Sequence, residues 1–504
     1  MSIDPNRTML EKLATLPPAD AWQALPASLW DESAARHLLQ RAGFSATPAE
    51  LARVLKEGPV ATLHRYFNQM PEFPRPAQVA ELAAESPRLA RRLKQDWAPE
   101  QKRLAQQEAR ERSRDALLDM TIRWLQLASR PENSPAEKWL LFLSDVWVVS
   151  IEKVKNAALI YRHEEILRSR ALGSAVDLAK AMSRSPAMVV YLDLQQSRRD
   201  APNENFAREL FELFTLGEGN YTENDIKQAA RAFTGYRQLD GQFEFARRQH
   251  DDGRKTVFGQ TGNYDGDDIM ELVFRQKAAS TFLPREMVRF YLSETPLPAA
   301  YTDSLGSQWA RQGYDLRRLA VMFFSSRAFF AEDFRGSFIK SPVQFYLGLL
   351  QDLGLNVAPI PRQVVGPLRQ MGQLPFDPPN VRGWIGGRAW INSATLAARR
   401  QLIDALLHPL NQAALNADDT MALNTAASGG ATHFTLDEER VRAWAKLPPG
   451  EAAARLLACS LPGRTDDALR VRIADFLQHG TGNPEAAVRT ALGALLDSPD
   501  YQLC

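Results

Sequence analysis

Apolar residues recur every three to four positions along most of the chain, which is the spacing of an amphipathic helix. Segments with this pattern cover residues 31–44, 99–128, 134–149, 156–169, 174–183, 203–216, 223–233 and 436–504. Alternating apolar and polar residues, typical of strands, occur at 241–259 around an Asp252-Gly253 pair that favours a tight turn. The pattern predicts a mainly α protein, a multi-helix globular body with one or two small β-hairpins.

The same pattern divides the chain into three regions. We expect an N-terminal extension over residues 1–30, a main helical domain over 31–405 with its hairpin near 241–259, and a C-terminal helical region over 406–504. Within the last region, residues 415–434 are LNADDTMALNTAASGGATHF, a run of small and polar residues that predicts a flexible insertion.

Charge and cysteine content narrow the class of protein. The 504 residues include 61 Lys and Arg against 60 Asp and Glu, so the net charge is +1 and no overall attraction to nucleic acid is expected. Two cysteines are too few for a disulfide scaffold. The first residues lack a signal-peptide pattern, and no apolar run reaches the roughly 20 residues that span a bilayer. We expect a cytoplasmic, soluble protein without a membrane span or a nucleic-acid partner.

The stretch PNENFARELFELFTLGEGNYT, residues 202–222, is the first candidate for a functional site. A helical wheel gathers its polar side chains on one arc, which comprises Glu204, Asn205, Arg208, Glu209 and Glu212. Asn203 can cap the start of this helix and Gly217 can end it. The arc is either a ligand-binding surface or a solvated face stabilised by i, i+4 ion pairs.

A second candidate lies in the predicted hairpin, where His250, Asp251, Asp252 and Lys255 fall within six residues. A histidine beside carboxylates can bind a metal or act as a general base. The alternative is an exposed polar turn in which the Asp-Gly pair serves only the turn geometry.

The third candidate is the loop FDPPNVRGWIGGRAWINSATLAARR, residues 376–400, which leads into a helix that starts near Asn392. Arg382 and Arg388 add positive charge, and Trp384 and Trp390 can stack on a sugar or a base. Its glycines let backbone approach a ligand closely, but no Gly-Lys-Ser/Thr follows, so the loop is not a P-loop. The alternative is a structural loop whose tryptophans fill the core.

Several segments occur in the order found in one protein family. They are AARHLLQRAGFSATPAEL, SPAMVVYLD, PNENFARELFELFTLGEGNYTENDIKQAARAFTGY, HDDGRKTVFG, IKSPVQF and FDPPNVRGWIGGRAWINSATLAARR. Over residues 30–405 the chain resembles the bacterial domain-of-unknown-function 1800 family. This resemblance implies no settled reaction. It implies a partner similar to a sulfatase or phosphatase, whose genes often lie beside the family's genes. Because many members carry an export signal, it also implies co-export to the periplasm as the alternative location.

The resemblance joins the three distant candidates into one expected site. The residues that match the family's motifs are Asn203, Glu204, Asn205, Arg208, Glu209, His250, Asp251, Gly253, Lys255, Gly383, Trp384 and Trp390. The catalytic residues we expect are Glu204, Arg208, Glu209, His250 and Asp251. The ligand-binding residues we expect are Asn203, Asn205, Lys255, Arg382, Trp384, Arg388 and Trp390.

One segment departs from the family pattern. Where relatives have Trp-His-Asn-His-Phe, this chain has Leu143, Ser144, Asp145, Val146 and Trp147, so both histidines are absent. His250 and Asp251 alone are too few ligands for a tight zinc site, which needs three or four. We therefore expect no tightly bound transition metal and leave the cofactor unknown.

Two hypotheses follow for the function. The first is an enzyme that acts on an anionic or sugar-containing substrate in a polar pocket, with Glu204, Arg208 and His250 around one concave surface. The second is a non-catalytic scaffold that works with the sulfatase- or phosphatase-like protein. The sequence leaves the oligomeric state open.

Overall fold

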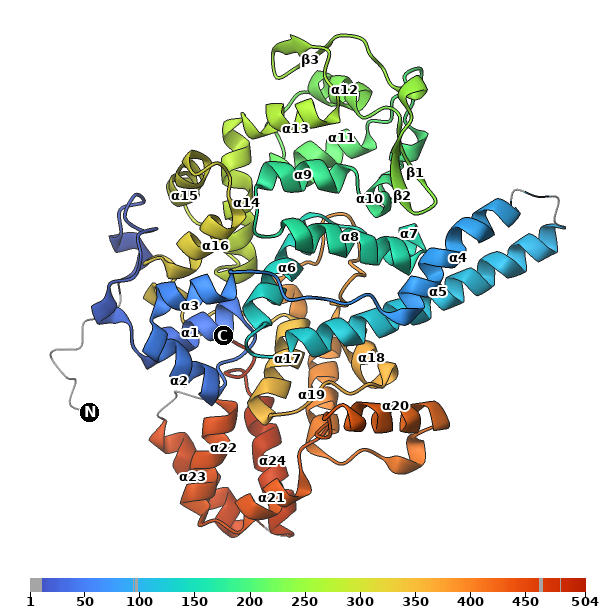
Figure 1. Ribbon diagram of the computed structural model, residues 1–504. Coiled ribbons are helices and arrows are strands. Elements are labelled where there is room, and N and C mark those ends of the chain that lie inside the picture. The colour runs from blue at the N-terminus through green and yellow to red at the C-terminus, as the bar shows by residue number, and fades with distance from the viewer. Residues whose placement is uncertain (1–10, 94, 96–97, 462–465, 481) are drawn as a thin grey trace.

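The computed structural model describes residues 11–93, 95, 98–461, 466–480 and 482–504, and most of them are helical (Figure 1). The helices of the first half are α1 Glu32–Ala42, α2 Pro48–Glu57, α3 Pro59–Tyr66, α4 Ala77–Leu93, α5 Pro99–Ala128, α6 Ser134–Val146, α7 Ile151–Val154, α8 Ala157–Arg170, α9 Ala175–Ser183, α10 Pro186–Tyr191, α11 Asn205–Glu209 and α12 Glu223–Ala232. Those of the second half are α13 Gly266–Phe274, α14 Lys277–Tyr291, α15 Ala299–Arg311, α16 Leu316–Ser325, α17 Pro342–Leu353, α18 Pro361–Met371, α19 Ser393–Leu407, α20 Ala417–Ser428, α21 Glu438–Ala445, α22 Pro449–Ser460, α23 Asp467–His479 and α24 Pro484–Leu496. The prediction of a mainly α protein with small hairpins is confirmed.

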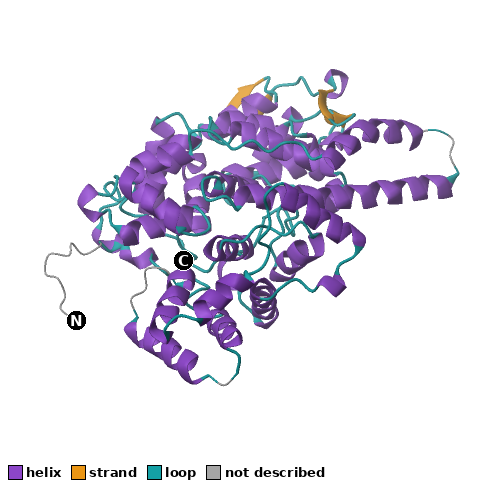
Figure 2. Ribbon diagram, turned by 60° about the horizontal axis from the view of Figure 1, so that its bottom comes forward, coloured by secondary structure: helices purple, strands orange, loops and turns teal. Residues whose placement is uncertain are grey.

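Helices α4 and α5 form an arm that projects from one side of the body, as both ribbon views show (Figures 1 and 2). The first part of α5 is exposed and highly charged, and buried residues begin at Ser113. From Ala116 to Trp124 the same helix packs into the core. One long helix therefore belongs to the arm at its start and to the body at its end, as the apolar pattern of 99–128 predicts.

The described residues contain two antiparallel hairpins rather than one across 241–259. Strand β1 (Tyr236–Leu239) pairs with β2 (Gln242–Phe245), and β3 (Lys255–Val257) pairs with β4 (Gln260–Gly262). The prediction of a turn at Asp252-Gly253 was wrong. The tight turns lie at Asp240-Gly241 and Phe258-Gly259, where both residues have positive φ, as a type I′ turn requires. The 252–253 pair lies in the connection between the hairpins.

Helix α6 lies at the centre of the body (Figure 1). Its residues Trp139, Leu140, Phe142 and Leu143 are at most 1% exposed, and most of the helix is buried on every side. A helix that is apolar all round requires such a position. Its C-terminal end carries Asp145 out of this core toward the surface described below.

The C-terminal helices pack beneath α17 and α19 and return the chain to the main body. Lys340 donates its backbone N–H to the carbonyl of Gln502, and Ile339 forms an antiparallel bridge with Leu503. The segment 415–434, predicted to be a flexible insertion, contains the helix α20. Within the described part of the chain, no helix is both long and apolar enough to cross a membrane.

Candidate functional site

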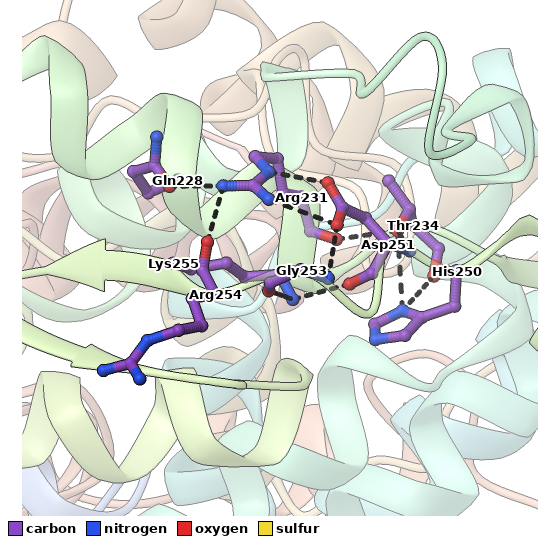
Figure 3. A network of polar contacts seen from close by, with 8 residues as sticks. All are labelled: Gln228, Arg231, Thr234, His250, Asp251, Gly253, Arg254 and Lys255. Atoms are coloured by element: carbon purple, nitrogen blue, oxygen red, sulfur yellow. Dashed lines mark hydrogen bonds and ion pairs between the residues drawn. The ribbon is translucent and has the colours of Figure 1, made fainter.

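The His250 cluster is a closed hydrogen-bond network in the structure (Figure 3). His250 is 5% exposed, and its Nδ1 donates to the carbonyl oxygen of Thr234 at 3.0 Å. The Thr234 hydroxyl donates to the carbonyl of Arg231 and accepts the backbone N–H of Asp251. Lys255 is 1% exposed, and its Nζ donates to the carbonyls of Asp251 (2.6 Å) and Gly253 (3.0 Å). Burial lowers the pKa of Lys255.

The same network fixes the Asp251 carboxylate from two sides (Figure 3). The Arg231 guanidinium donates to both Asp251 oxygens, at 2.6 and 3.2 Å, and the Gly253 N–H donates to Oδ1 at 2.8 Å. The bond from Arg231 lowers the pKa of Asp251. A Cβ on Gly253 would lie 2.7 Å from Arg231 Nη2 and 2.9 Å from Asp251 Oδ1, so a side chain there would displace this ion pair. The donors and acceptors of this cluster satisfy one another, which is how a segment between two hairpins is held.

The start of the 202–222 stretch also has structural partners. The Asn203 and Asn205 side chains donate to the carbonyls of Asp193 and Leu192. Arg208 pairs with Glu223 at 2.8 Å and with Glu204 at 3.4 Å on an exposed surface. Four expected site residues, Asn203, Glu204, Asn205 and Arg208, are therefore not part of the cleft lined by the 381–389 loop, and neither is His250.

A cleft of about 650 Å³ brings together other residues of the expected site. Its walls are the C-terminal end of α6, the chain from Glu212 to Glu218, helix α14 and the loop 381–389. Three of the expected ligand-binding residues, Arg382, Trp384 and Arg388, line it. Lining residues that the prediction missed include Asp145, Glu218, Arg285, Glu286, Arg289 and Glu294.

Two glycines allow the 381–389 loop to lie against these carboxylates. Gly383 has φ +78°, and a Cβ there would lie 2.1 Å from Oδ1 of Asp145. Gly387 has φ +66°, and a Cβ would lie 2.5 Å from the carboxyl carbon of Glu294. The sequence predicts a close backbone approach to a ligand; the approach seen here is to the protein's own carboxylates.

Asp145 is the most deeply placed carboxylate of the cleft, with a side chain that is 2% exposed. Its Oδ1 accepts the backbone N–H of Trp384 at 2.8 Å, and its Oδ2 accepts from Arg289 at 2.9 Å. Burial raises the pKa of Asp145, and the opposing attraction of Arg289 only partly offsets this. Burial lowers the pKa of Arg289, but Asp145 and Glu286 outweigh that effect and raise it. The result is a buried carboxyl with an increased affinity for a proton.

The arginines of the cleft differ in their partners. Arg382 is neutralised by Glu212 at 3.0 Å and Glu218 at 2.9 Å. Arg285 and Arg388 are exposed and form no ion pair with any described residue. The indole Nε1 of the buried Trp384 likewise has no hydrogen-bond acceptor among the described residues. Of these groups, the exposed Arg285 and Arg388 are the donors that an anionic ligand in the cleft can satisfy.

A π-helical turn shapes the wall opposite α14. After α11 the backbone widens over Leu210–Thr215, and the Leu216 N–H bonds back five residues to Phe211. Such turns change the direction of side chains within a helix and often occur at functional sites. Glu212 thereby reaches Arg382, whereas Arg208 on the preceding turn reaches Glu223. Glu209 is half-buried beside them, and burial followed by repulsion from Glu212 raises its pKa.

Trp390 lies behind the cleft rather than in it. The side chain is 6% exposed and belongs to the core, beside a narrow cavity that it shares with Trp384 and Lys138. Lys138 donates from Nζ to the carbonyls of Arg41 and Gly43 and to Gln344, and burial lowers its pKa to about 7.

Among the described residues, no group of three or more His, Cys, Asp and Glu is arranged to hold a metal ion.

The missed residues differ in whether the sequence contained a signal for them. Asp145 stands at the centre of the segment 143–147, where the resemblance leads one to expect Trp-His-Asn-His-Phe, and Asp145 and Val146 both line the cleft. That segment was therefore a usable pointer to the site. Arg285, Glu286 and Arg289 lie on an ordinary amphipathic helix with no local motif, so only the fold identifies them.

Comparison with known proteins places the chain in a family. The model of the family described as "Protein of unknown function (DUF1800)" matches residues 37–503, and the chain belongs to this family. The match extends past residue 405, where the resemblance ended, and so includes the C-terminal helices. Searches of curated proteins and of solved structures find no similar protein.

Proposed function

We propose that the cleft is the active site of an enzyme that acts on an anionic or sugar-containing substrate. One observation carries the proposal: exposed arginines without carboxylate partners face the same cleft as a buried carboxyl whose pKa is raised. Catalytic carboxyls are commonly buried to raise their pKa toward the working pH. Unpaired guanidinium groups at such a place favour an anionic substrate.

Each group then has a role set by its position. Arg285 and Arg388 hold the anionic group of the substrate. Asp145 acts as the acid, because burial favours its protonated form. Glu294 is exposed and forms no ion pair with a described residue, so it is available as the base.

Thermal melting tests the binding step with inorganic phosphate, sulfate and glucuronate at constant ionic strength. At roughly ten times Kd, a bound anion stabilises the folded state by about 1.4 kcal/mol. We expect this stabilisation in the wild type and in Arg208→Gln, whose exposed arginine pairs outside the cleft. It should disappear in Arg285→Gln and in Arg388→Gln. Equal stabilisation of all four proteins would place the anion elsewhere.

Hydrolysis of p-nitrophenyl phosphate, sulfate and glucuronide tests the chemical step. We expect turnover of at least one of these, and a loss of about a hundredfold or more in Asp145→Asn, the usual effect of removing a general acid. Turnover that Asp145→Asn leaves unchanged would remove Asp145 from the mechanism.

One observation favours the alternative, a non-catalytic scaffold or partner of a sulfatase- or phosphatase-like protein. Val146 lines the cleft with an apolar side chain at a position where the family pattern has a histidine. A protein that binds an anion in the cleft but turns over none of these esters or glycosides would support this function.

A further inference from the structure

A second groove, of about 770 Å³, lies between the arm and the body. Helices α4 and α5 form one side of it, and α7, α8 and the turn between β1 and β2 form the other. Both ribbon views show the arm leaving the body at this place (Figures 1 and 2). The groove shares no lining residue with the cleft, so it is a separate surface.

The floor of the groove carries accessible apolar side chains. Leu89 and Leu93 of α4 and Val190 of α10 are partly exposed in the lining, and Leu239, at the end of β1, is 50% exposed. Apolar side chains gathered in one groove, rather than scattered singly, suit a protein partner.

The rim of the groove is basic. Five cationic residues line it, Arg75, Arg91, Arg110, Lys155 and Arg162, against the single carboxylate of Asp240. Arg75 and Arg162 pair with Glu165. The other three cations are exposed and have no ion pair with any described residue. Because the whole chain has a net charge of only +1, this excess is a local property of the groove.

We propose that this groove binds an acidic amphipathic helix of a partner protein. An apolar floor accepts the apolar face of a helix, with anchors at i, i+3 and i+4. Carboxylates flanking that face meet Arg91, Arg110 and Lys155, which gives the charge complementarity that selects a partner. Nucleic acid is disfavoured, because no aromatic ring is present among the described residues of the lining to stack on a base.

Fluorescence anisotropy tests the proposal with a labelled synthetic peptide of roughly 15 residues, long enough to form a helix, whose leucines share one helix face and whose other positions are glutamate. Replacing Arg91 and Arg110 together by Glu should weaken binding about tenfold or more, from the loss and reversal of two ion pairs. Leu239→Ser should also weaken it. Arg114→Glu is the matched control, because Arg114 is an exposed residue of α5 outside the lining.

Four outcomes would overturn the proposal. The first is an equal loss in Arg114→Glu and the double variant, which would show general charge attraction. The second is tighter binding of a matching lysine–leucine peptide or of a single-stranded oligothymidylate. The third is dimerisation of the wild type that the double variant abolishes, because the groove would then bind a second copy. The fourth is unchanged affinity in a double variant whose melting temperature equals that of the wild type.

Discussion

The His250 network and the cleft contain the same kinds of residue and differ in how these residues are satisfied. Each has an arginine–carboxylate pair and a glycine that lies against the carboxylate, Gly253 in one and Gly383 in the other. In the network, Lys255 and Asp251 find their partners inside the protein. In the cleft, Arg285 and Arg388 have no ion pair with any described residue, and the buried Trp384 indole has no acceptor among them.

This difference shows that residue type alone does not identify a functional site. A buried polar cluster with every group satisfied makes a local fold rigid and unique. Unsatisfied groups at a concave surface cost stability and are kept where a ligand completes them. Substitution can distinguish a residue of a satisfied structural cluster, whose loss lowers stability, from a residue that is completed by a ligand, whose loss lowers binding.

The largest effect is expected for Trp390→Ala, because Trp390 belongs to the closed core although it lies on the cleft loop. Removing an indole that is 6% exposed should cost about 3 to 5 kcal/mol of unfolding free energy. Chemical denaturation measures this, with Arg388→Ala, exposed on the same loop, as the control. An unchanged midpoint for Trp390→Ala would show that the side chain is not part of the core.

Lys255→Met should have the next largest effect. It removes the ammonium that donates to the carbonyls of Asp251 and Gly253, and losing two hydrogen bonds from a charged donor costs about 2 to 4 kcal/mol. Denaturation of this variant is compared with that of Arg254→Met, whose side chain is exposed next to it. If Lys255→Met kept its stability but lost anion binding, the His250 network would be part of a functional site. The contrast between a structural network and a ligand-binding cleft would then be wrong.

Stability should depend on pH through His163, a buried histidine whose two ring nitrogens are both hydrogen-bonded inside the protein. Its Nε2 donates to the Trp147 carbonyl and its Nδ1 accepts from Ser185, and burial lowers its pKa from about 6.5 to about 4. The unfolded chain therefore takes up the proton first, and stability present above pH 6.5 is lost as the pH falls toward 4.

We expect His163 to account for about 2 to 3 kcal/mol of the stability lost between pH 7 and pH 4.5. The measurement is the difference between unfolding free energies at these two pH values, in the wild type and in His163→Gln. The constant cost of the substitution cancels in that difference. An identical pH dependence in both proteins would mean that the folded state accommodates a charged His163.

Much of the fold was readable from the sequence, because helices depend on a local periodicity. The helix over 99–128 and the start of a helix near Asn392 appear as predicted. The hairpins were misplaced, since an Asp-Gly pair also occurs at 240–241. The pair at 252–253 lies instead beside Asp251, which is held by Arg231 and by the Gly253 N–H.

The candidate site was only partly predictable. The wheel used for 203–216 assumes a regular α-helix, and the π-helical turn from Leu210 separates the direction of Glu212 from that of Arg208. Arg285 and Arg289 reach the cleft through the packing of α14, which no spacing along the chain encodes. Conversely, the segment alone made His250 look catalytic. Its burial and its hydrogen bond to the Thr234 carbonyl depend on the fold, so the local sequence does not reveal them.

The smallest effect on stability is expected for Arg285→Gln. The Arg285 guanidinium makes only long contacts, 3.3 Å to the Thr281 hydroxyl and 3.4 Å to the Leu216 carbonyl, and no ion pair with a described residue. Its removal should change the unfolding free energy by less than about 0.5 kcal/mol. Arg208→Gln, which loses exposed pairs with Glu204 and Glu223, should cost roughly 0.2 to 1 kcal/mol.

Chemical denaturation at low ionic strength resolves this order, because salt screens the Arg208 pairs. A cost above about 1 kcal/mol for Arg285→Gln would exceed what an unpaired surface cation can contribute. Arg285 would then have to form an ion pair or strong hydrogen bond within the protein in solution. The cleft, like the His250 network, would be a structural cluster rather than a ligand site. A neutral effect on stability, combined with lost stabilisation by phosphate or sulfate, is the behaviour that only a ligand-binding arginine can show.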